Sequence, residues 1–377
     1  MPLHRLRRAC LLLGLAALIL FGSGCRAPRD LPLGPVRTEA GANARAVALA
    51  EAIRAILPSD RGAAAIAIDE GDAVRVAFAG DPAISRGTLF EFGSITKVAT
   101  ANLVAQRVLA GALDLDRPLV ALPGGEPLGD AWSATTLRQL LTHSSGLSGW
   151  PPDLGPVRIT LSGRLGDPFA DYDGDDLLRG MQRQRRPTPD GDFVYSNYAF
   201  AILGRVLEAE SGGAYDALLA QRFLRPVGTR TMTLRGWSSG DVAPPLSRRG
   251  RPTTNWAFEA FAPAGALRGS LDDGIALLRH AMTACARDEP VARATCRTQH
   301  SEGFWMNETS EMGLAWVRTT RDDDVVVWHN GGTGGYSTFL GFAEKARRGV
   351  VVLTNVGFLR EIDGLAMDAI AARDTDL

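Results

Sequence analysis

A helix that begins near Ser94 constrains the fold of this chain more than any other stretch, because it is apolar on almost every face. It follows the apolar run 89–92, turns at Gly93 and is expected to run to Ala110. Gly111 comes next and suits the left-handed backbone with which helices commonly end. A helix that is apolar nearly all round is a buried one. We therefore expect this helix in the interior of the protein.

The first turn of this helix carries the pattern Ser94-x-x-Lys97, which places a hydroxyl and an amine one turn apart on the same face. Burial lowers the pKa of a lysine and so frees its amine to act as a base. The helix dipole favours negative charge on the serine. These are the features of an activated serine nucleophile. The pattern alone also fits a capping serine beside a lysine whose amine reaches solvent.

A second polar stretch precedes an apolar helix that is expected over 199–210. Tyr195 and Asn197 stand two residues apart in the loop before this helix. A loop that starts a buried helix can direct a phenol and an amide into a cleft. An N-cap asparagine beside a packed tyrosine remains an equal alternative.

A third stretch, 329–335, is rich in glycine and begins with a histidine and an asparagine. It is expected as the connection between two strands. Glycine lets a ligand approach backbone N–H groups closely. A phosphate cradle is disfavoured, since the stretch has no lysine and no helix follows it.

Together, these stretches resemble the motifs of the serine β-lactamase and penicillin-binding-protein superfamily, in its class C β-lactamase, DD-peptidase and esterase branch. That superfamily carries S-x-x-K, then Y-x-N, then K-T-G or H-x-G. The resemblance covers roughly residues 42–373. It implies an α/β (α+β) fold, in which an antiparallel sheet is flanked by helices, an all-helical subdomain is inserted over roughly 112–262, and the active site lies between them. The matching segments are Ser94-Ile95-Thr96-Lys97, Tyr195-Ser196-Asn197 and His329-Asn330-Gly331.

The resemblance also implies a role for each matching residue. Ser94 would attack an acyl carbonyl, and Lys97 and Tyr195 would share the removal and delivery of its proton. The backbone N–H groups of Ser94 and Gly332 would form an oxyanion hole, worth about 3 kcal/mol per donor. No cofactor and no metal ion is implied. The substrate-binding residues would be Asn197, His329 and Gly331.

Two departures from the β-lactamase pattern bear on the substrate. His329 replaces a lysine and Asn330 a threonine, which weakens the case for antibiotic hydrolysis and favours peptidase- and esterase-like relatives. The apolar run 325–328 favours a neutral histidine ring. Selectivity for carboxylate-bearing substrates should then rise as pH falls through the histidine pKa, which is ~6.5 when unperturbed. Lactams, D-amino-acid peptides of the cell wall and esters remain open as substrates.

Three other interpretations are disfavoured. A non-catalytic relative that binds penicillins or muropeptides as a sensor would be expected to lack the nucleophile or the base, and both are present. The segment 236–240 fits the G-x-S-x-G motif of α/β-hydrolases, but the residues 241–245 cannot open the helix that this motif requires. His143 ends a helix expected over 136–143, and we interpret it as bonded to nearby backbone rather than as a catalytic base.

The N-terminus indicates export. Three arginines precede the apolar run 9–21, which is shorter than the ~20 residues of a membrane span. Residues 1–24 are therefore expected to be a signal peptide, and the protein is expected in the periplasm. Cys25 follows small residues, as in a bacterial lipoprotein, although Gly22 stands where that motif usually has leucine. Lipidation of Cys25 and ordinary cleavage both remain open. The proline-containing segment 25–41 is expected to be a linker to the hydrolase domain 42–377.

Composition narrows the range of partners. The net charge is −1 and no long basic run is present, so nucleic acid is an unsuited partner and a small-molecule or peptide substrate is expected. Cys285 and Cys296 are the only cysteines outside the leader and bracket a short loop. In an exported protein this arrangement favours a disulfide over two free thiols.

The remaining elements follow from hydrophobic period and turn residues. The acidic segment 167–176 is interpreted as a solvated loop before a helix at Leu177, because Gly174 falls too early for a calcium loop of the EF-hand type. Helices are expected over 42–57, 271–282 and from 362. Strands are expected over 63–68, 73–79, 313–318, 324–329, 337–342 and 349–354.

Overall fold

The computed structural model describes residues 34–125, 128–154, 167–184, 192–237 and 240–372. The predicted signal peptide, the predicted lipidation site Cys25 and Ser238 of the G-x-S-x-G match lie outside these ranges. Within them, no helix combines the length and the apolar character that a membrane crossing requires.

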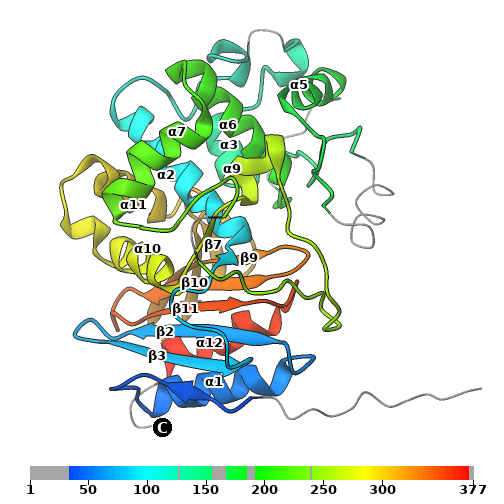
Figure 1. The fold of residues 1–377 in the computed structure, drawn as a ribbon. Coiled ribbons are helices and arrows are strands. Elements are labelled where there is room, and N and C mark those ends of the chain that lie inside the picture. The colour runs from blue at the N-terminus through cyan, green and yellow to red at the C-terminus, as the bar shows by residue number, and fades with distance from the viewer. Residues whose placement is uncertain (1–33, 126–127, 155–166, 185–191, 238–239, 373–377) are drawn as a thin grey trace, which may run out of the picture. The chain divides into compact units, whose positions relative to one another are not determined.

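An antiparallel sheet lies below a group of helices in the view of Figure 1, and the predicted fold class is confirmed. Its strand order is β1-β3-β2-β11-β10-β9-β8-β7-β6. Inside the sheet, the second strand of the described chain therefore pairs with the last one, β2 with β11. The strands are β1 (Arg37–Thr38), β2 (Ala63–Asp69), β3 (Val74–Gly80), β6 (Phe304–Trp305), β7 (Ser310–Met312), β8 (Val317–Arg321), β9 (Asp324–Gly332), β10 (Ser337–Ala343) and β11 (Gly349–Thr354).

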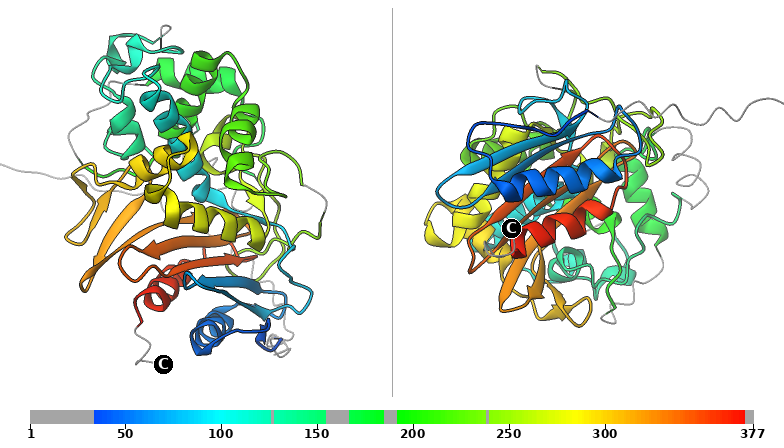
Figure 2. Two further views of the ribbon diagram at one scale, coloured as in Figure 1. Left: turned by 90° about the vertical axis from the view of Figure 1, so that its left-hand side faces the viewer. Right: turned by 90° about the horizontal axis from the view of Figure 1, so that it is seen from below.

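Helices cover both faces of the sheet, which is why its central strands are apolar at nearly every position. Helices α1 (Ala44–Ile56) and α12 (Glu361–Ala371) lie side by side on one face (Figure 2). Helix α10 (Leu271–Thr283) packs on the opposite face. Successive side chains of β2 alternate between the two cores. Ala64, Ile66 and Ile68 pack with α1 and α12, and Ala63, Ala65 and Ala67 pack on the side of α10.

Helix α2 (Thr96–Leu109) is enclosed by other helices, as the sequence predicts. Its residues Thr96–Ala105 are all buried. It is contacted by helices α6 (Asn197–Ser211), α7 (Tyr215–Leu219), α9 (Ala262–Gly265) and α11 (Pro290–Gln299). A single 3₁₀ turn, Gly93–Ile95, precedes it. The other elements are α3 (Leu137–Leu141), α5 (Gly174–Arg183), α8 (Arg225–Val227) and the strand pair β4 (Phe90–Glu91) and β5 (Arg268–Gly269).

Three sequence-based assignments are wrong. The strand expected over 313–318 contains the turn between β7 and β8, in which Gly313 N–H donates to the Trp316 carbonyl. Strand β9 continues to Gly332, so the third motif lies in a strand instead of a connection. Helix α5 begins at Gly174 rather than Leu177, because the Asp173 carboxylate caps its first N–H groups. The turn at Gly313 and the cap of α5 are local, with partners two or three residues away, and the extent of β9 is set by its pairing with β10.

A disulfide links Cys285 to Cys296, with 4.8 Å between their Cα atoms. It connects the turn after α10 to α11. The bond therefore fixes a helix that the hydrophobic pattern alone did not predict.

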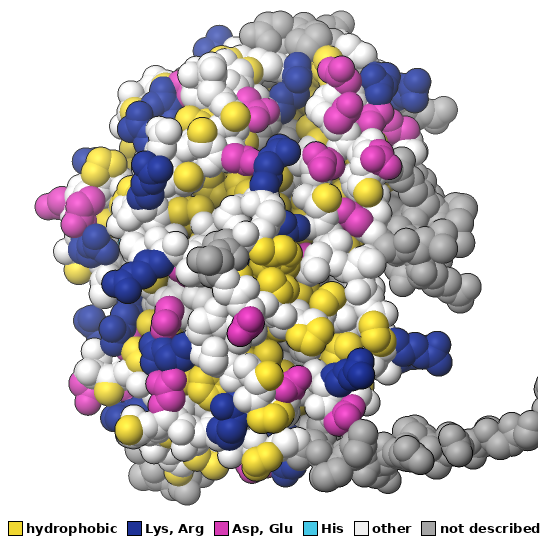
Figure 3. Space-filling model, in the orientation of Figure 1, with side chains coloured by type: hydrophobic (Ala, Val, Ile, Leu, Met, Phe, Trp, Pro, Cys, Tyr) yellow, Lys and Arg dark blue, Asp and Glu magenta, His cyan; other side chains and the backbone are white. Residues whose placement is uncertain are grey.

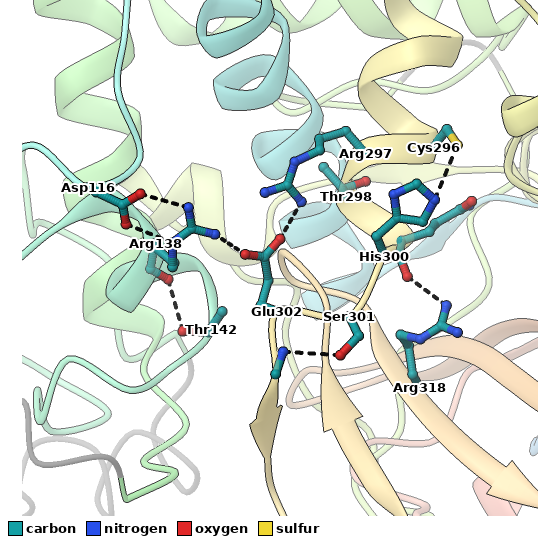
Figure 4. A network of polar contacts seen from close by, with 12 residues as sticks. Asp116, Arg138, Thr142, Cys296, Arg297, Thr298, His300, Ser301, Glu302 and Arg318 are labelled. Carbon is teal, nitrogen blue, oxygen red and sulfur yellow. Dashed lines mark hydrogen bonds and ion pairs between the residues drawn. The ribbon is translucent and has the colours of Figure 1, made fainter.

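Glu302 is the centre of a polar network that ties α3 and α11 to the edge of the sheet (Figure 4). Only 4% of its side chain is exposed, and it accepts hydrogen bonds from Arg138 and Arg297. Arg138 also bonds Asp116, with 2.7 Å between Nε and Oδ1. Elsewhere, charged side chains of both signs are interspersed over the face shown in Figure 3. A nearly buried carboxylate depends on its cations far more than such exposed groups do.

Replacing Glu302 should therefore destabilise the protein. Glu302→Gln leaves two partly buried guanidinium groups without their shared carboxylate, and we expect a loss of about 2 kcal/mol in the free energy of unfolding. The measurement is denaturant unfolding. Glu51→Gln is the matched control, since the Arg54–Glu51 pair is 36% and 47% exposed, and it should cost less than about 0.5 kcal/mol. Equal losses in the two variants would contradict the assigned role of Glu302.

Candidate active site

The amine of Lys97 lies at the centre of the candidate site. The side chain is fully buried, and Nζ lies 3.0 Å from Ser94 Oγ. The same nitrogen is 2.7 Å from Asn197 Oδ1 and 2.7 Å from the carbonyl oxygen of Ala264. Helices α6 and α9 supply these two oxygens, so three helices fix the position of the amine.

The protonation state of Lys97 follows from this geometry. Burial lowers its pKa well below the ordinary value, and its hydrogen-bond partners within the described part of the chain include no carboxylate. A neutral amine has two N–H donors and one lone pair. The oxygens of Asn197 and Ala264 can only accept, so they take both donors. The lone pair is then left facing Ser94 Oγ, where it can accept the hydroxyl proton.

Tyr195 contacts both members of this pair. Its hydroxyl bonds the Ser94 side chain, and its ring centroid lies 4.9 Å from Lys97 Nζ. Burial raises the pKa of Tyr195, and the bond to Ser94 offsets part of that rise. The residue as a whole is 38% exposed, and it lines the cavity. Tyr195 is therefore a neutral phenol at neutral pH and can pass on a proton.

Ser196, not Asn197, caps helix α6. Its Oγ accepts a hydrogen bond of 3.0 Å from Ala199 N–H. The alternative in which Asn197 is the N-cap is therefore wrong. Because the cap is provided by its neighbour, the Asn197 side chain is able to reach Lys97.

His143 supports the Tyr195 loop, in agreement with its interpretation as a residue bonded to nearby backbone. Its Nδ1 accepts a hydrogen bond from Ser196 N–H at 3.0 Å, and its carbonyl accepts one from Val194 N–H at 3.0 Å. Its ring lies 4.4 Å from the Tyr195 ring. Burial holds its pKa well below the ordinary value, and a positive charge on Lys97 or His329, when either is protonated, lowers it further. His143 thus positions Tyr195 without adding a charge.

Glycines allow the end of β9 to meet the turn that carries Ser94. A Cβ at Gly93 would lie 2.7 Å from Gly332 N, and one at Gly331 would lie 2.0 Å from the Phe92 carbonyl oxygen. Gly93 also has a φ of +54°. Larger residues would separate the strand from the turn. The contact brings the backbone of Gly332 next to that of Ser94, as the predicted oxyanion hole requires.

His329 is neutral, but for a stronger reason than the sequence indicates. It is buried, its Nδ1 lies 2.6 Å from the Asn330 carbonyl oxygen, and that oxygen can only accept, so Nδ1 carries the proton. Burial and, next, the positive charge that Lys97 carries when it is protonated lower the pKa of His329 to about 3. The titration expected near neutral pH is therefore absent at this residue. His329 is an uncharged hydrogen-bonding group throughout the range from about pH 5 to 8.

Two charged residues at the start of α12 complete the site, and the sequence analysis missed both. Asn330 Nδ2 donates a 2.6 Å hydrogen bond to Asp363 Oδ2. Burial raises the pKa of Asp363 to about 6, against this bond and the charge of Arg360, which lower it. Arg360 is exposed at the N-cap of α12. The sequence predicts this helix but holds no signal that its first turn borders the site.

A cavity of about 470 Å³ lies among these residues. Its volume lies in the range of small-molecule sites. Lys97 lies beneath the floor, while Arg360 and Asp363 border the cavity together with several aromatic rings. The residues predicted from the motifs that line it are Ser94, Tyr195, Asn197, His329, Gly331 and Gly332.

A serine bonded to a neutral buried lysine and a phenol, inside a small-molecule cavity, is the arrangement of a serine-nucleophile protein. The chain belongs to the Beta-lactamase family, whose model matches residues 51–372. It is 29% identical to Penicillin-binding protein 4 of Amycolatopsis lactamdurans over 302 residues, which are 73% of this chain and 74% of that protein. It is 34% identical to Esterase EstB of Burkholderia gladioli over 157 residues, 38% of each chain. The class C beta-lactamase of Rhodobacter sphaeroides has the same fold, with a TM-score of 0.71, 21% identity, and coverage of 87% of this chain and 98% of that one.

The pKa values of the groups around the cavity predict that Asp363, and not His329, makes substrate selectivity depend on pH. Asp363 loses its negative charge as pH falls through about 6, whereas His329 gains charge only near about 3. The ratio of kcat/KM for a carboxylate-bearing ester to that for a neutral ester should therefore rise about fivefold from pH 8 to 5.

Asp363→Asn should remove this rise, because the amide carries no charge at either pH. His329→Gln should keep it. The measurement is the ratio of the two substrates at each pH, in which changes common to both esters cancel. If the rise persists in Asp363→Asn and disappears in His329→Gln, the pH dependence of the ratio is caused by His329 and not by Asp363.

Proposed function

We propose that this protein is a serine hydrolase that acts through an acyl-enzyme on an amide, lactam or ester, and that it is most similar in activity to DD-peptidases and esterases. The observation that carries the proposal is the 3.0 Å contact between Ser94 Oγ and the buried Lys97 amine, whose pKa is lowered by burial. A serine in this environment has a base already in place.

The reaction follows from the positions of the groups. Ser94 Oγ attacks the acyl carbonyl while its proton passes to the Lys97–Tyr195 pair. The negative charge that forms on the carbonyl oxygen is bound by the N–H groups of Ser94 and Gly332. Tyr195 delivers the proton to the leaving group, which departs and leaves the acyl group on Ser94. Water then attacks this ester, assisted by the same pair, and releases the acid.

His329 stands where the β-lactamases carry a lysine, and a histidine at this position resembles the peptidase and esterase relatives. Penicillin-binding protein 4 and Esterase EstB, the two relatives described above, are named for penicillin binding and for ester cleavage. A sensor that binds penicillin or muropeptides without turnover is the second candidate. The complete Ser94, Lys97 and Tyr195 arrangement argues against it, because a sensor does not need groups that hydrolyse its acyl-enzyme.

Removal of the nucleophile tests this proposal. Ser94→Ala should lower the hydrolysis of short p-nitrophenyl esters at least about 1,000-fold, because it removes the hydroxyl that forms the acyl-enzyme. A fluorophosphonate should label the Ser94 peptide once. Ser238→Ala is the control for the G-x-S-x-G match and should retain both activity and labelling. Labelling at Ser238 would contradict the assignment, and a stable acyl group on Ser94 without turnover would support the sensor.

We also propose that the protein is exported to the periplasm and anchored through a lipid on Cys25, on the basis of the arginine-led apolar segment and the small residues before the cysteine. Wild type should enter the detergent phase in phase partitioning, and Cys25→Ser should stay in the aqueous phase. An aqueous wild type that has lost residues 1–24 would exclude the anchor and retain export.

A further inference from the structure

An aromatic wall forms one side of the cavity, and the function of the motif residues does not account for it. Its rings come from four separate parts of the chain and make a continuous series of contacts, with centroids 4.8–6.1 Å apart. All six rings line the cavity. The aromatic wall consists of Trp150, Phe169, Trp256, Phe258, Phe261 and Phe358.

Several features show that the wall is more than core packing. Phe358 is 43% exposed, and Trp150 is half-buried. Phe258 and Phe358 both have left-handed backbone, with φ of +69° and +54°, a conformation that costs non-glycine residues about 1–3 kcal/mol and clusters at functional sites. A Cβ on Gly265 would lie only 2.4 Å from the Phe258 ring. The chain therefore accepts strain and uses a glycine to hold these rings at the cavity.

The wall is attached to the catalytic groups at both of its ends. Trp150 follows Gly149, whose carbonyl accepts hydrogen bonds from Asn197 N–H at 3.1 Å and Tyr198 N–H at 3.2 Å. At the other end, the Phe358 ring lies 3.1 Å from the position that a Cβ of Gly332 would occupy. A group bonded to Ser94 between Asn197 and Gly332 therefore lies within reach of the rings.

We propose that the aromatic wall binds the acyl group of the substrate and selects acids that carry an aryl or other bulky apolar group. This inference rests on the proposed serine hydrolase function. The acyl group, unlike the leaving group, stays on Ser94 through both steps, beside the Asn197 end of the wall. Burial of a phenyl group against the rings removes its apolar surface from water and stabilises the transition states of acylation and deacylation.

The experiment compares p-nitrophenyl acetate with p-nitrophenyl 4-phenylbutyrate, which share a leaving group. Each kcat/KM is divided by the rate of hydroxide-catalysed hydrolysis of the same ester, and the ratio of phenylbutyrate to acetate is taken. Wild type should favour phenylbutyrate about 30-fold or more. Trp150→Ala and Phe358→Ala should each lower this preference about tenfold.

Trp305→Ala is the matched control, because Trp305 is 55% exposed in β6 and does not line the cavity. It should leave the preference unchanged. Phe358→Ala removes an exposed ring and keeps a non-glycine residue at a left-handed position, so its backbone cost is unaltered. Thermal unfolding of all three variants confirms that they fold.

Three results would overturn the inference. The first is a wild-type preference near one. The second is a preference that neither Trp150→Ala nor Phe358→Ala lowers. The third is a preference for the alcohol part of the ester instead of the acyl part. It would be seen if kcat/KM, divided by the rate of hydroxide-catalysed hydrolysis, were far higher for 4-nitrobenzyl acetate than for ethyl acetate, which have the same acyl group. Failure of the proposed function is a different result, because p-nitrophenyl acetate would then remain intact and Ser94 would be unlabelled.

Discussion

The burial of an uncharged lysine amine is the constraint on which this structure depends. An ammonium without a carboxylate partner is expensive to bury, and the protein avoids that cost by lowering the pKa of Lys97. The amine then needs acceptors for its N–H groups, and it takes them from α6 and α9 through Asn197 and Ala264. The packing of these helices around α2 is therefore the same feature that directs the lone pair of the base toward Ser94.

The second requirement is that the sheet reaches the nucleophile. Strand β9 ends against the turn that carries Ser94 at a distance that only glycine permits at Gly93 and Gly331. The Thr338 hydroxyl donates a 2.9 Å hydrogen bond to the Phe92 carbonyl beside this contact. Helical and sheet layers are thus joined at the site itself. A side chain at either glycine would disturb the oxyanion donors and the nucleophile together.

Sequence reasoning recovered the groups that act over short chain distances and, through the resemblance to a known family, the three motifs that the fold brings together at the cavity. It missed the other groups that the fold assembles there. The buried helix after Ser94 and the pairing of its serine with Lys97 follow from a period of 3.6 residues, which is local. Arg360, Asp363 and the aromatic wall belong to segments far apart in the chain, and no periodicity brings them together. For His329, the apolar neighbours gave the correct direction of the pKa change. Its size depends on complete burial and on Lys97, which only the folded structure places nearby.

Aromatic rings also connect the basicity of Lys97 to the exclusion of water. The rings of Tyr195 and Phe200 have centroids 4.9 Å and 5.4 Å from Nζ, so the faces of the amine that make no hydrogen bond are covered by apolar surface. Of these two rings, that of Tyr195 lines the cavity and is accessible to water. An apolar group in the cavity would displace water from that side. When water leaves, an uncharged amine loses less hydration free energy than an ammonium does. An apolar group in the cavity would therefore keep Lys97 in the uncharged form, which accepts the Ser94 proton. Substrate binding and activation of the nucleophile are then coupled through the same surface.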